Sequence, residues 1–287
     1  MGSTSTCEGK TILMLGDSLL EGFLFPTPSA PPSQFMIPLL RPANASSGCV
    51  EFINATFPGF QTHEILERFE MVAMELKKNR KEIHVACVLG GTNDLGFWKE
   101  PHEILSNLKK IYRAIRKHSP HAHIIITTIP DCRDDGETLK TRRTAVNDAL
   151  REMDRADDSE LARGDESGRK PKRGGSSEEG VDDMISTGQG ATEGEPKGGD
   201  EGKGSATTTD HGFFRPLIAS SSHKKRGRMI VMDLFSHIPF ERDCELWTPR
   251  NQNMSMWHAD GLHFSPNGYK RVGELYVDVI TREGLLD

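Results

Sequence analysis

The sequence of 287 residues has no apolar run that approaches the roughly 18 residues of a transmembrane helix. Basic residues are also fewer than acidic ones: the sequence has 36 Lys and Arg and 42 Asp and Glu, which gives a formal net charge of −6. A protein that binds nucleic acid needs a basic surface to meet the phosphates. We therefore expect no membrane span and no nucleic-acid partner.

Aromatic residues are missing from residues 154–210, which contain no Phe, Tyr or Trp. The same stretch holds 12 of the 28 glycines and only four large aliphatic residues. Such a segment cannot bury enough apolar surface to offset the entropy that folding costs. The remaining 230 residues suit one large domain. We predict a single domain over residues 1–287, interrupted by a disordered low-complexity insertion at about 154–210.

The five cysteines form no C-x-x-C pair, and their number is odd. This pattern fits a reducing compartment better than a disulfide framework or a zinc knuckle. The first apolar run, Thr11–Leu15, is too short for a secretory signal, so we predict a cytoplasmic protein. Residues 1–6 fit the loose pattern for myristoylation at Gly2, with Cys7 as a second acylation site; the alternative is a polar tail without a lipid.

Short apolar segments alternate with segments of helical periodicity. The apolar segments have the length of buried strands and are Thr11–Leu15, Val50–Asn54, Ile83–Leu89, His123–Ile129 and Met229–Phe235. The helical segments are Ile65–Leu76, Ile104–Ile115, Glu137–Met153 and Pro266–Thr281. This alternation predicts an α/β protein with a parallel sheet that is covered by helices on both faces.

Residues suited to catalysis follow the predicted strands. Ser18 comes after the first strand, Gly59 after the second and Asn93 after the third. Asp260 and His263 come from the long loop after the fifth strand. Because the loops at the carboxyl ends of parallel strands meet at one edge, these residues are expected to converge there. A hydroxyl, a base, a group that orients the base and donors for an oxyanion are what nucleophilic acyl transfer needs.

Each residue has a predicted role in that chemistry. Ser18 is the nucleophile, and His263 is the base that takes its proton. Asp260 accepts a hydrogen bond from the second ring nitrogen and fixes the tautomer. The donors to the oxyanion are the backbone N–H groups of Ser18 and Gly59 and the side-chain amide of Asn93.

The remaining histidines predict no further site. His258 is near the expected site but lacks a following Asp partner, so we interpret it as a residue of the loop or pocket lining. No further ligands accompany His121 and His123, and His63–Glu64 is not part of H-E-x-x-H. Nucleotide-binding glycine motifs are also absent. We therefore expect neither a metal nor an organic cofactor.

These residues, in this order, resemble the SGNH hydrolases, also called the GDSL esterase/lipase family. Gly16–Leu19 matches the first block of the family, and Asn54–Gly59 looks like the second. Gly91–Asp94 matches the third block, G-x-N-D. Asp260–His263, together with Ser265–Tyr269, matches the fifth. The resemblance covers nearly all of the chain outside the predicted insertion.

The resemblance implies a three-layer α/β/α sandwich similar to flavodoxin, with a parallel five-stranded sheet in the order 2-1-3-4-5. Strands 1 and 3 are neighbours in that order, which would bring Ser18 and Asn93 side by side. It also implies hydrolysis of esters and thioesters without a metal or organic cofactor. The four residues in the name SGNH would be Ser18, Gly59, Asn93 and His263.

The chain departs from the family pattern in both of the first two blocks. Thr56 stands where the second block often has Gly, and Phe60 stands where a small or polar residue often follows Gly59. Leu20–Glu21 replaces the small residues that often follow the first block. With Phe60 at this position, we expect the pocket near Gly59 to be more apolar than is usual in the family.

The sequence thus predicts a serine ester hydrolase that acts on a small carboxylic ester through an acyl-enzyme intermediate. The type that resembles isoamyl-acetate-hydrolysing esterase is the nearest, with Phe57, Phe60, Phe97 and Trp98 lining a small acyl pocket. A carbohydrate O-acetyl esterase, an acyltransferase to an alcohol and a non-catalytic binding or scaffold protein on the same fold are the alternatives. The sequence predicts no oligomeric state.

Overall fold

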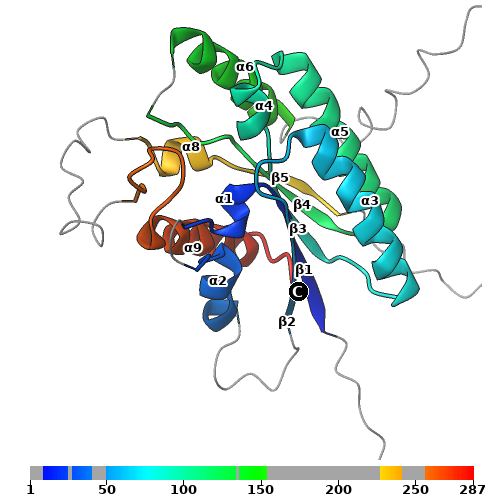
Figure 1. Cartoon of the computed structure of the whole chain (residues 1–287). Coiled ribbons are helices and arrows are strands. Elements are labelled where there is room, and N and C mark those ends of the chain that lie inside the picture. The colour runs from blue at the N-terminus through cyan, green and yellow to red at the C-terminus, as the bar shows by residue number, and fades with distance from the viewer. Residues whose placement is uncertain (1–8, 25–27, 41–49, 134–135, 154–226, 241–255) are drawn as a thin grey trace, which may run out of the picture. The chain divides into compact units, whose positions relative to one another are not determined.

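The structure is a computed structural model that describes residues 9–24, 28–40, 50–133, 136–153, 227–240 and 256–287. It contains a five-stranded, fully parallel sheet with the strand order β2-β1-β3-β4-β5 (Figure 1). This order confirms the one that the family resemblance implies. The predicted insertion at about 154–210 and the acylation site at Gly2 lie outside the described residues.

The strands lie close to the five predicted apolar segments. They are β1 (Lys10–Gly16), β2 (Val50–Thr56), β3 (Val85–Leu89), β4 (His123–Thr127) and β5 (Met229–Met232). The prediction that the fifth strand continues to Phe235 is wrong. Asp233 ends it, because its side chain accepts a hydrogen bond from the Ser236 N–H and caps the short helix α8 (Leu234–His237).

The four helices predicted from periodicity are all present. They are α3 (Thr62–Lys78), α5 (Pro101–His118), α6 (Glu137–Met153) and α9 (Pro266–Arg282). Proline occupies the first position of α5, preceded by a capping box between Glu100 and Glu103. The Ser265 hydroxyl begins α9 by accepting the Gly268 N–H at 3.1 Å. Among the described helices, none has the length and apolar character to cross a membrane.

Four short helices were not predicted. They are α1 (Ser18–Glu21), α2 (Pro32–Leu40), α4 (Thr92–Gly96) and α8. Three of them span five residues or fewer, which is too short for a periodic pattern. The fourth, α2, contains Pro38, a residue that ordinarily argues against a helix interior. Because α1 follows β1 and α4 follows β3, two of these helices carry predicted site residues.

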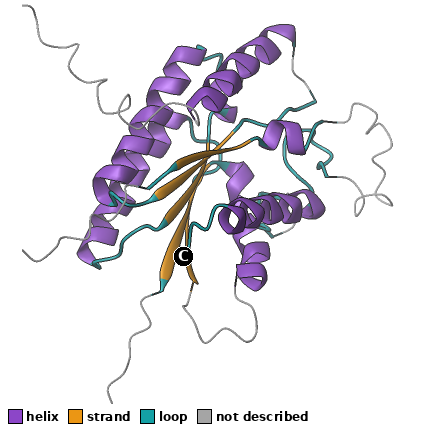
Figure 2. Cartoon of the chain, turned by 180° about the vertical axis from the view of Figure 1, so that it is seen from behind, coloured by secondary structure: helices purple, strands orange, loops and turns teal. Residues whose placement is uncertain are grey.

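Alternate residues of each strand enter two separate cores. Ile12 and Met14 of β1 belong to the core that also contains side chains of α1, α2, α8 and α9. Leu13 and Leu15 belong to the core on the opposite face, with side chains of α3, α4, α5 and α6. Figure 2 shows helices on both sides of the sheet. The predicted three-layer α/β/α architecture is confirmed.

Gly16 sets the spacing at the carboxyl edge of the sheet. It is the last residue of β1 and pairs with Leu89 on one side and Thr56 on the other. A Cβ at this position would lie only 2.2 Å from the Leu89 carbonyl oxygen, so no other residue fits. The Gly16 carbonyl also accepts the Phe57 N–H at 2.8 Å. The loops after β1, β2 and β3 therefore begin beside one another.

Candidate active site

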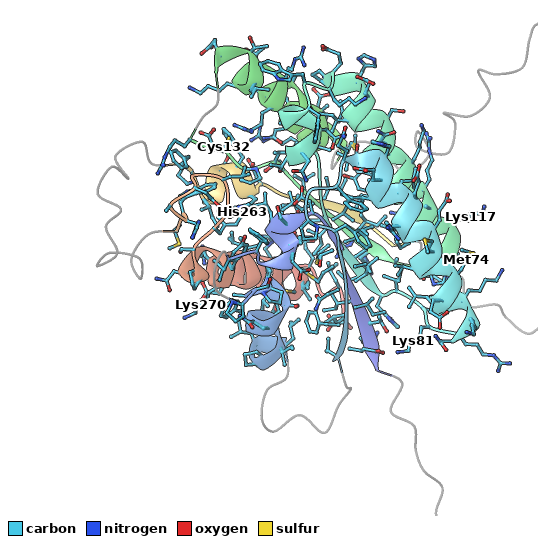
Figure 3. All side chains as sticks on the ribbon, viewed as in Figure 1. Met74, Lys81, Lys117, Cys132, His263 and Lys270 are labelled. Atoms are coloured by element: carbon cyan, nitrogen blue, oxygen red, sulfur yellow. The ribbon has the colours of Figure 1, made fainter. Side chains whose placement is uncertain are left out.

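Ser18 is the first residue of α1 and follows β1 after a single residue. Its Oγ lies 2.9 Å from Nε2 of His263, although the two residues are 245 positions apart in the chain. The second ring nitrogen of His263, Nδ1, lies 2.8 Å from Oδ2 of Asp260. Figure 3 labels His263 beside α1. A carboxylate, an imidazole and a hydroxyl thus form one continuous chain of hydrogen bonds.

The loop before α9 holds His263 in a defined place. Trp257 and Phe264 form an antiparallel bridge, and next to it the His258 N–H donates to the His263 carbonyl at 2.8 Å. The Gly261 N–H closes a tight turn by donating to the His258 carbonyl at 3.0 Å. Gly261 has a φ of +69°, a left-handed conformation that costs glycine little. Residues 256–265 therefore form a small hairpin.

The Asp260 carboxylate is oriented by the backbone of this hairpin. Its Oδ1 accepts hydrogen bonds from the N–H groups of Leu262 and His263, both at 2.9 Å. Partial burial alone would raise the pKa of Asp260, but the bonds from the His263 ring and these N–H groups outweigh burial and hold it well below its usual range. Asp260 is therefore ionised near neutral pH and can stabilise a positive charge on His263.

Arg133, in the segment that follows β4, is hydrogen-bonded to this hairpin. Its backbone N–H donates to the Gly261 carbonyl at 2.8 Å, and its Nη1 donates to the Ala259 carbonyl at 3.0 Å. A Cβ on Gly261 would come within 2.5 Å of the Arg133 side chain. Arg133 was not predicted as a site residue, because nothing in the local sequence around it signals a contact with a residue 126 positions away.

Asp17 is a fully buried carboxyl immediately before Ser18. Its Oδ1 caps α1 by accepting the Leu19 N–H at 3.0 Å, and among the described residues its Oδ2 has no hydrogen-bond partner. Burial raises the pKa of Asp17 to about 7, because the Leu19 bond and nearby His263 only partly offset the loss of water. The charge beside the candidate nucleophile therefore changes near neutral pH.

The backbone N–H groups predicted to bind an oxyanion are available. Among the described residues, neither the Ser18 N–H nor the Gly59 N–H meets an acceptor. Gly59 has a φ of +81°, and a Cβ built there would meet nothing within 4 Å. The backbone conformation, rather than a crowded approach, thus explains glycine at this position. Phe57, two residues before Gly59, donates its N–H to the carbonyl of Gly16 at the end of β1.

Asn93 lies in α4, directly after β3. Its Nδ2 donates one hydrogen bond to the Phe60 carbonyl at 2.9 Å, next to Gly59 in the chain. A side-chain amide has two N–H hydrogens, so a second donor is left for a ligand. The next residue, Asp94, is buried and accepts the N–H and the hydroxyl of Thr62 at 2.8 and 2.7 Å. These bonds join α4 to the start of α3.

Two of the departures from the family pattern contact each other. The Thr56 hydroxyl donates a hydrogen bond to the Glu21 carboxylate. Leu20, the other departure in the first block, is fully buried in the core. The two unusual residues Glu21 and Thr56 thus link α1 to the end of β2.

The aromatic residues near the site differ in exposure. Phe23 was not predicted, yet its ring centroid lies 5.0 Å from that of His263, and its carbonyl accepts the Tyr269 hydroxyl at 3.1 Å. The four residues predicted to line an acyl pocket divide into two pairs. Phe57 and Phe60 are partly buried and stack at 5.7 Å, whereas Phe97 and Trp98 are 65% and 60% exposed.

No cluster of three or more His, Cys, Asp and Glu side chains suited to a metal ion occurs in the described ranges. His123, considered as a ligand from the sequence, accepts the Arg228 N–H through Nδ1 at 3.1 Å. The groups assembled at the edge of the sheet are a hydroxyl, an imidazole, a carboxylate and N–H donors. All of them are groups that acyl transfer uses.

Comparison with solved structures identifies relatives of this fold. A lipase/acylhydrolase from Enterococcus faecalis is 16% identical and has a TM-score of 0.53, with 96% of each chain covered. A GDSL-family lipolytic protein from Veillonella parvula is 14% identical with a TM-score of 0.55, covering 96% of this chain and all of the other. A family 3 carbohydrate esterase from Clostridium thermocellum is 13% identical with a TM-score of 0.53, covering 97% and 98%.

Comparison with sequences gives the family. No curated protein matches the chain. The profile of the GDSL-like Lipase/Acylhydrolase family matches residues 14–173, which is more than half of the chain and includes the first three motif blocks. The solved relatives support the same fold at low identity. The chain belongs to the GDSL-like lipase/acylhydrolase family.

Proposed function

We propose that the protein is a serine ester hydrolase in which Ser18 is the nucleophile. The observation that carries this proposal is the unbroken series of contacts from Asp260 through His263 to Ser18, at 2.8 and 2.9 Å. Both distances are within the reach of hydrogen bonds that transfer or orient a proton. The family assignment supports an acyl hydrolase independently of this geometry.

The first half of the reaction forms an acyl-enzyme. The Ser18 Oγ attacks the ester carbonyl carbon while its proton moves to Nε2 of His263. The carbonyl oxygen becomes an oxyanion, which the N–H groups of Ser18 and Gly59 and the amide of Asn93 stabilise. The carbon–oxygen bond to the alcohol then breaks, and His263 gives its proton to the leaving alcohol. Asp260 stabilises the imidazolium that exists between these two proton transfers.

The second half releases the acid. A water molecule attacks the acyl carbon while His263 Nε2 takes one of its protons. A second oxyanion forms among the same donors, and the bond from the acyl carbon to Ser18 Oγ breaks. His263 returns its proton to Oγ, so the enzyme regains its starting state. No further reactant is required beyond the ester and water.

A small carboxylic ester is the proposed substrate, as for the isoamyl-acetate-hydrolysing type. The support is the apolar surroundings of the site. The Phe23 ring contacts the His263 ring, and the rings of Phe57 and Phe60, which flank Gly59 in the sequence, stack on each other.

The cytoplasmic location remains a prediction from the cysteine pattern.

An acyl-chain series tests this substrate proposal. Nitrophenyl esters from acetate to laurate would be compared by kcat/KM with the purified protein. Each methylene that a small pocket rejects costs a few kcal/mol or less, so we expect the rate to fall at least tenfold between butyrate and octanoate. A rising rate toward long chains would contradict a small acyl pocket while leaving the serine mechanism intact.

A carbohydrate O-acetyl esterase is the second candidate. One solved relative is described as a family 3 carbohydrate esterase, and Phe97 and Trp98 are exposed aromatic rings just after the Asn93 helix. Exposed apolar surface of this kind often marks a ligand contact. Acetate release from acetylated sugars, with little activity on alkyl esters, would favour this candidate over the first.

A further inference from the structure

Two of the predicted oxyanion donors come from strands that are not neighbours in the sheet. Gly59 follows β2 and Asn93 follows β3, whereas β1, which precedes Ser18, lies between these two strands. The hydrogen bonds of the sheet therefore do not fix how far Gly59 lies from Asn93. Contacts between the loop after β2 and the helix after β3 must do so instead.

Two consecutive residues of α4 make such contacts. The Asn93 amide donates to the carbonyl of Phe60, the residue after Gly59, at 2.9 Å. The Asp94 carboxylate accepts the Thr62 N–H through Oδ2 at 2.8 Å and the Thr62 hydroxyl through Oδ1 at 2.7 Å. Both Asp94 and Thr62 are buried. The loop after β2 is thus bound to α4 at Phe60 and again at Thr62.

Gly59 lies between two anchored points of that loop. The Phe60 N–H donates to the Phe57 carbonyl at 3.1 Å and closes a turn in which Gly59 is the third residue. The Phe57 N–H, at the start of this turn, is bound to the Gly16 carbonyl of β1 at 2.8 Å. After the turn, the next side chain bound to α4 is that of Thr62. The direction of the Gly59 N–H therefore depends on both anchors.

The contact between Asp94 and Thr62 is more than a local helix cap. Thr62 is the first residue of α3, where a backbone N–H has no partner within the helix. A capping box between Gln61 and Glu64 already begins this helix. Asp94 is 32 positions away, and burial of its carboxyl group costs free energy that the two charge-assisted bonds offset. A buried carboxylate is therefore used to join two loops rather than to start one helix.

We infer that Asp94 is a positioning residue for the oxyanion site, because by binding both donors of Thr62 it holds the Gly59 N–H at a fixed distance from the Asn93 amide. The inference rests on the proposed function, in which these two groups stabilise the same oxyanion. Such donors are effective only when they already point at the developing charge. A misplacement of about 1 Å can cost about 10²-fold in rate. Asp94 is buried, so it acts through Thr62 and not on the substrate.

Two variants separate the hydrogen bonds from the charge of Asp94. Asp94→Asn keeps the shape of the side chain but places an amide donor against a donor of Thr62. Thr62→Val keeps the Asp94 charge and removes only the hydroxyl bond, whereas Thr62→Ser retains both donors and is the conservative variant. Asn107→Ala removes a different hydrogen bond to the same Thr62 hydroxyl, at 3.2 Å, and leaves Asp94 untouched. It is the control for lost stability alone.

The charge of Asp94 also acts on Asp17. Burial, which is the larger cause, and the nearby Asp94 both raise the pKa of Asp17, to about 7. Loss of the Asp94 charge therefore lowers the pKa of Asp17. All rates are compared at about pH 8.5, where Asp17 is mostly ionised with or without Asp94. A difference in rate then reports the position of the donors and not the charge beside Ser18.

The readouts are kcat and KM for nitrophenyl acetate and the inhibition constant of a trifluoromethyl ketone, which an activated serine converts into a tetrahedral adduct with an oxyanion. We expect Asp94→Asn to lower kcat about tenfold and to weaken this inhibitor by a similar factor, with KM changed by less than about twofold. The loss is smaller than the 10²–10³-fold of a missing donor, because the donors are displaced and not removed. Thr62→Val should show part of the effect, and Thr62→Ser should restore the rate.

Thermal unfolding of each variant shows whether it folds, and Thr62→Val decides the test if Asp94→Asn does not. A kcat loss in Asp94→Asn no larger than in Asn107→Ala, or a rise in KM without weaker inhibition, would overturn the inference. If the unmodified protein hydrolyses no ester, the proposed function fails. The NMR order parameter of the Gly59 N–H then tests the positioning by itself. It should fall in Asp94→Asn and Thr62→Val but not in Asn107→Ala, and equal values in all variants would contradict the role of Asp94.

Discussion

Ser18→Ala is expected to lower kcat for nitrophenyl acetate by at least about 10⁴-fold, because no other group at the site can form the acyl-enzyme. In a well-studied serine protease, removal of the nucleophile or of the base costs about 10⁶-fold in kcat, and what remains comes from the oxyanion donors and binding. The Ser18 Oγ contacts His263, and the turn around Ser18 is held by Asp17 instead. The fold should therefore survive the substitution.

Hydrolysis rates and thermal unfolding of the Ser18→Ala variant provide the measurement. Ser106→Ala, an exposed serine in the middle of α5, serves as the control for loss of one hydroxyl and should retain full activity. A Ser18→Ala variant that keeps more than a few per cent of the rate would show that another group is the nucleophile.

Asn93→Ala is expected to lower kcat by about 10²–10³-fold with little change in KM. Loss of one oxyanion donor costs that much in a comparable hydrolase, because the donor acts on charge that exists only in the transition state. The structure leaves one N–H of the Asn93 amide for this role, since the other is bound to the Phe60 carbonyl. Steady-state kinetics on a short-chain ester would separate kcat from KM.

Asn107→Ala is the matched control for Asn93→Ala. Asn107 donates to the Thr62 hydroxyl at 3.2 Å, so its loss also removes a side-chain hydrogen bond, but from the contact between α3 and α5. We expect this variant to lose some stability and little activity. An Asn93→Ala variant that raises KM while keeping kcat would contradict the oxyanion role and indicate ordinary substrate binding.

Most of the fold could be predicted because hydrophobic patterning decides it. The segment Ile83–Leu89 is apolar except for His84, as is typical of a strand buried on both faces, and it contains β3. The short helices were not predicted because each depends on a single N-terminal capping residue, such as Asp17 for α1 and Asp233 for α8. Helix α2 has a proline in its interior and is stabilised by packing against α9 rather than by propensity.

The predicted site residues followed from one rule, that loops after parallel strands share an edge. The rule requires no knowledge of side-chain positions. The structure places the His263 ring within hydrogen-bonding distance of both Ser18 and Asp260. Their catalytic roles and those of Gly59 and Asn93 stay predictions.

Three contacts of the site could not be predicted from the sequence. Arg133 contacts the hairpin from the loop after β4, and the Phe23 ring contacts the His263 ring. The backbone turn of the hairpin brings the His258 ring close to the Asp260 carboxylate. Each depends on the path of the backbone between distant or tightly turned segments. Residue type and spacing along the chain do not encode that path.

The account depends most on whether His263 activates Ser18, and covalent labelling with a fluorophosphonate probe measures this directly. Such a probe reacts with an activated serine and leaves an inert one unmodified. Peptide mass spectrometry is predicted to locate a single adduct on Ser18, with no adduct in Ser18→Ala and at least a hundredfold slower labelling in His263→Ala. A protein that remains unlabelled, or that is labelled equally fast without His263, would contradict the account.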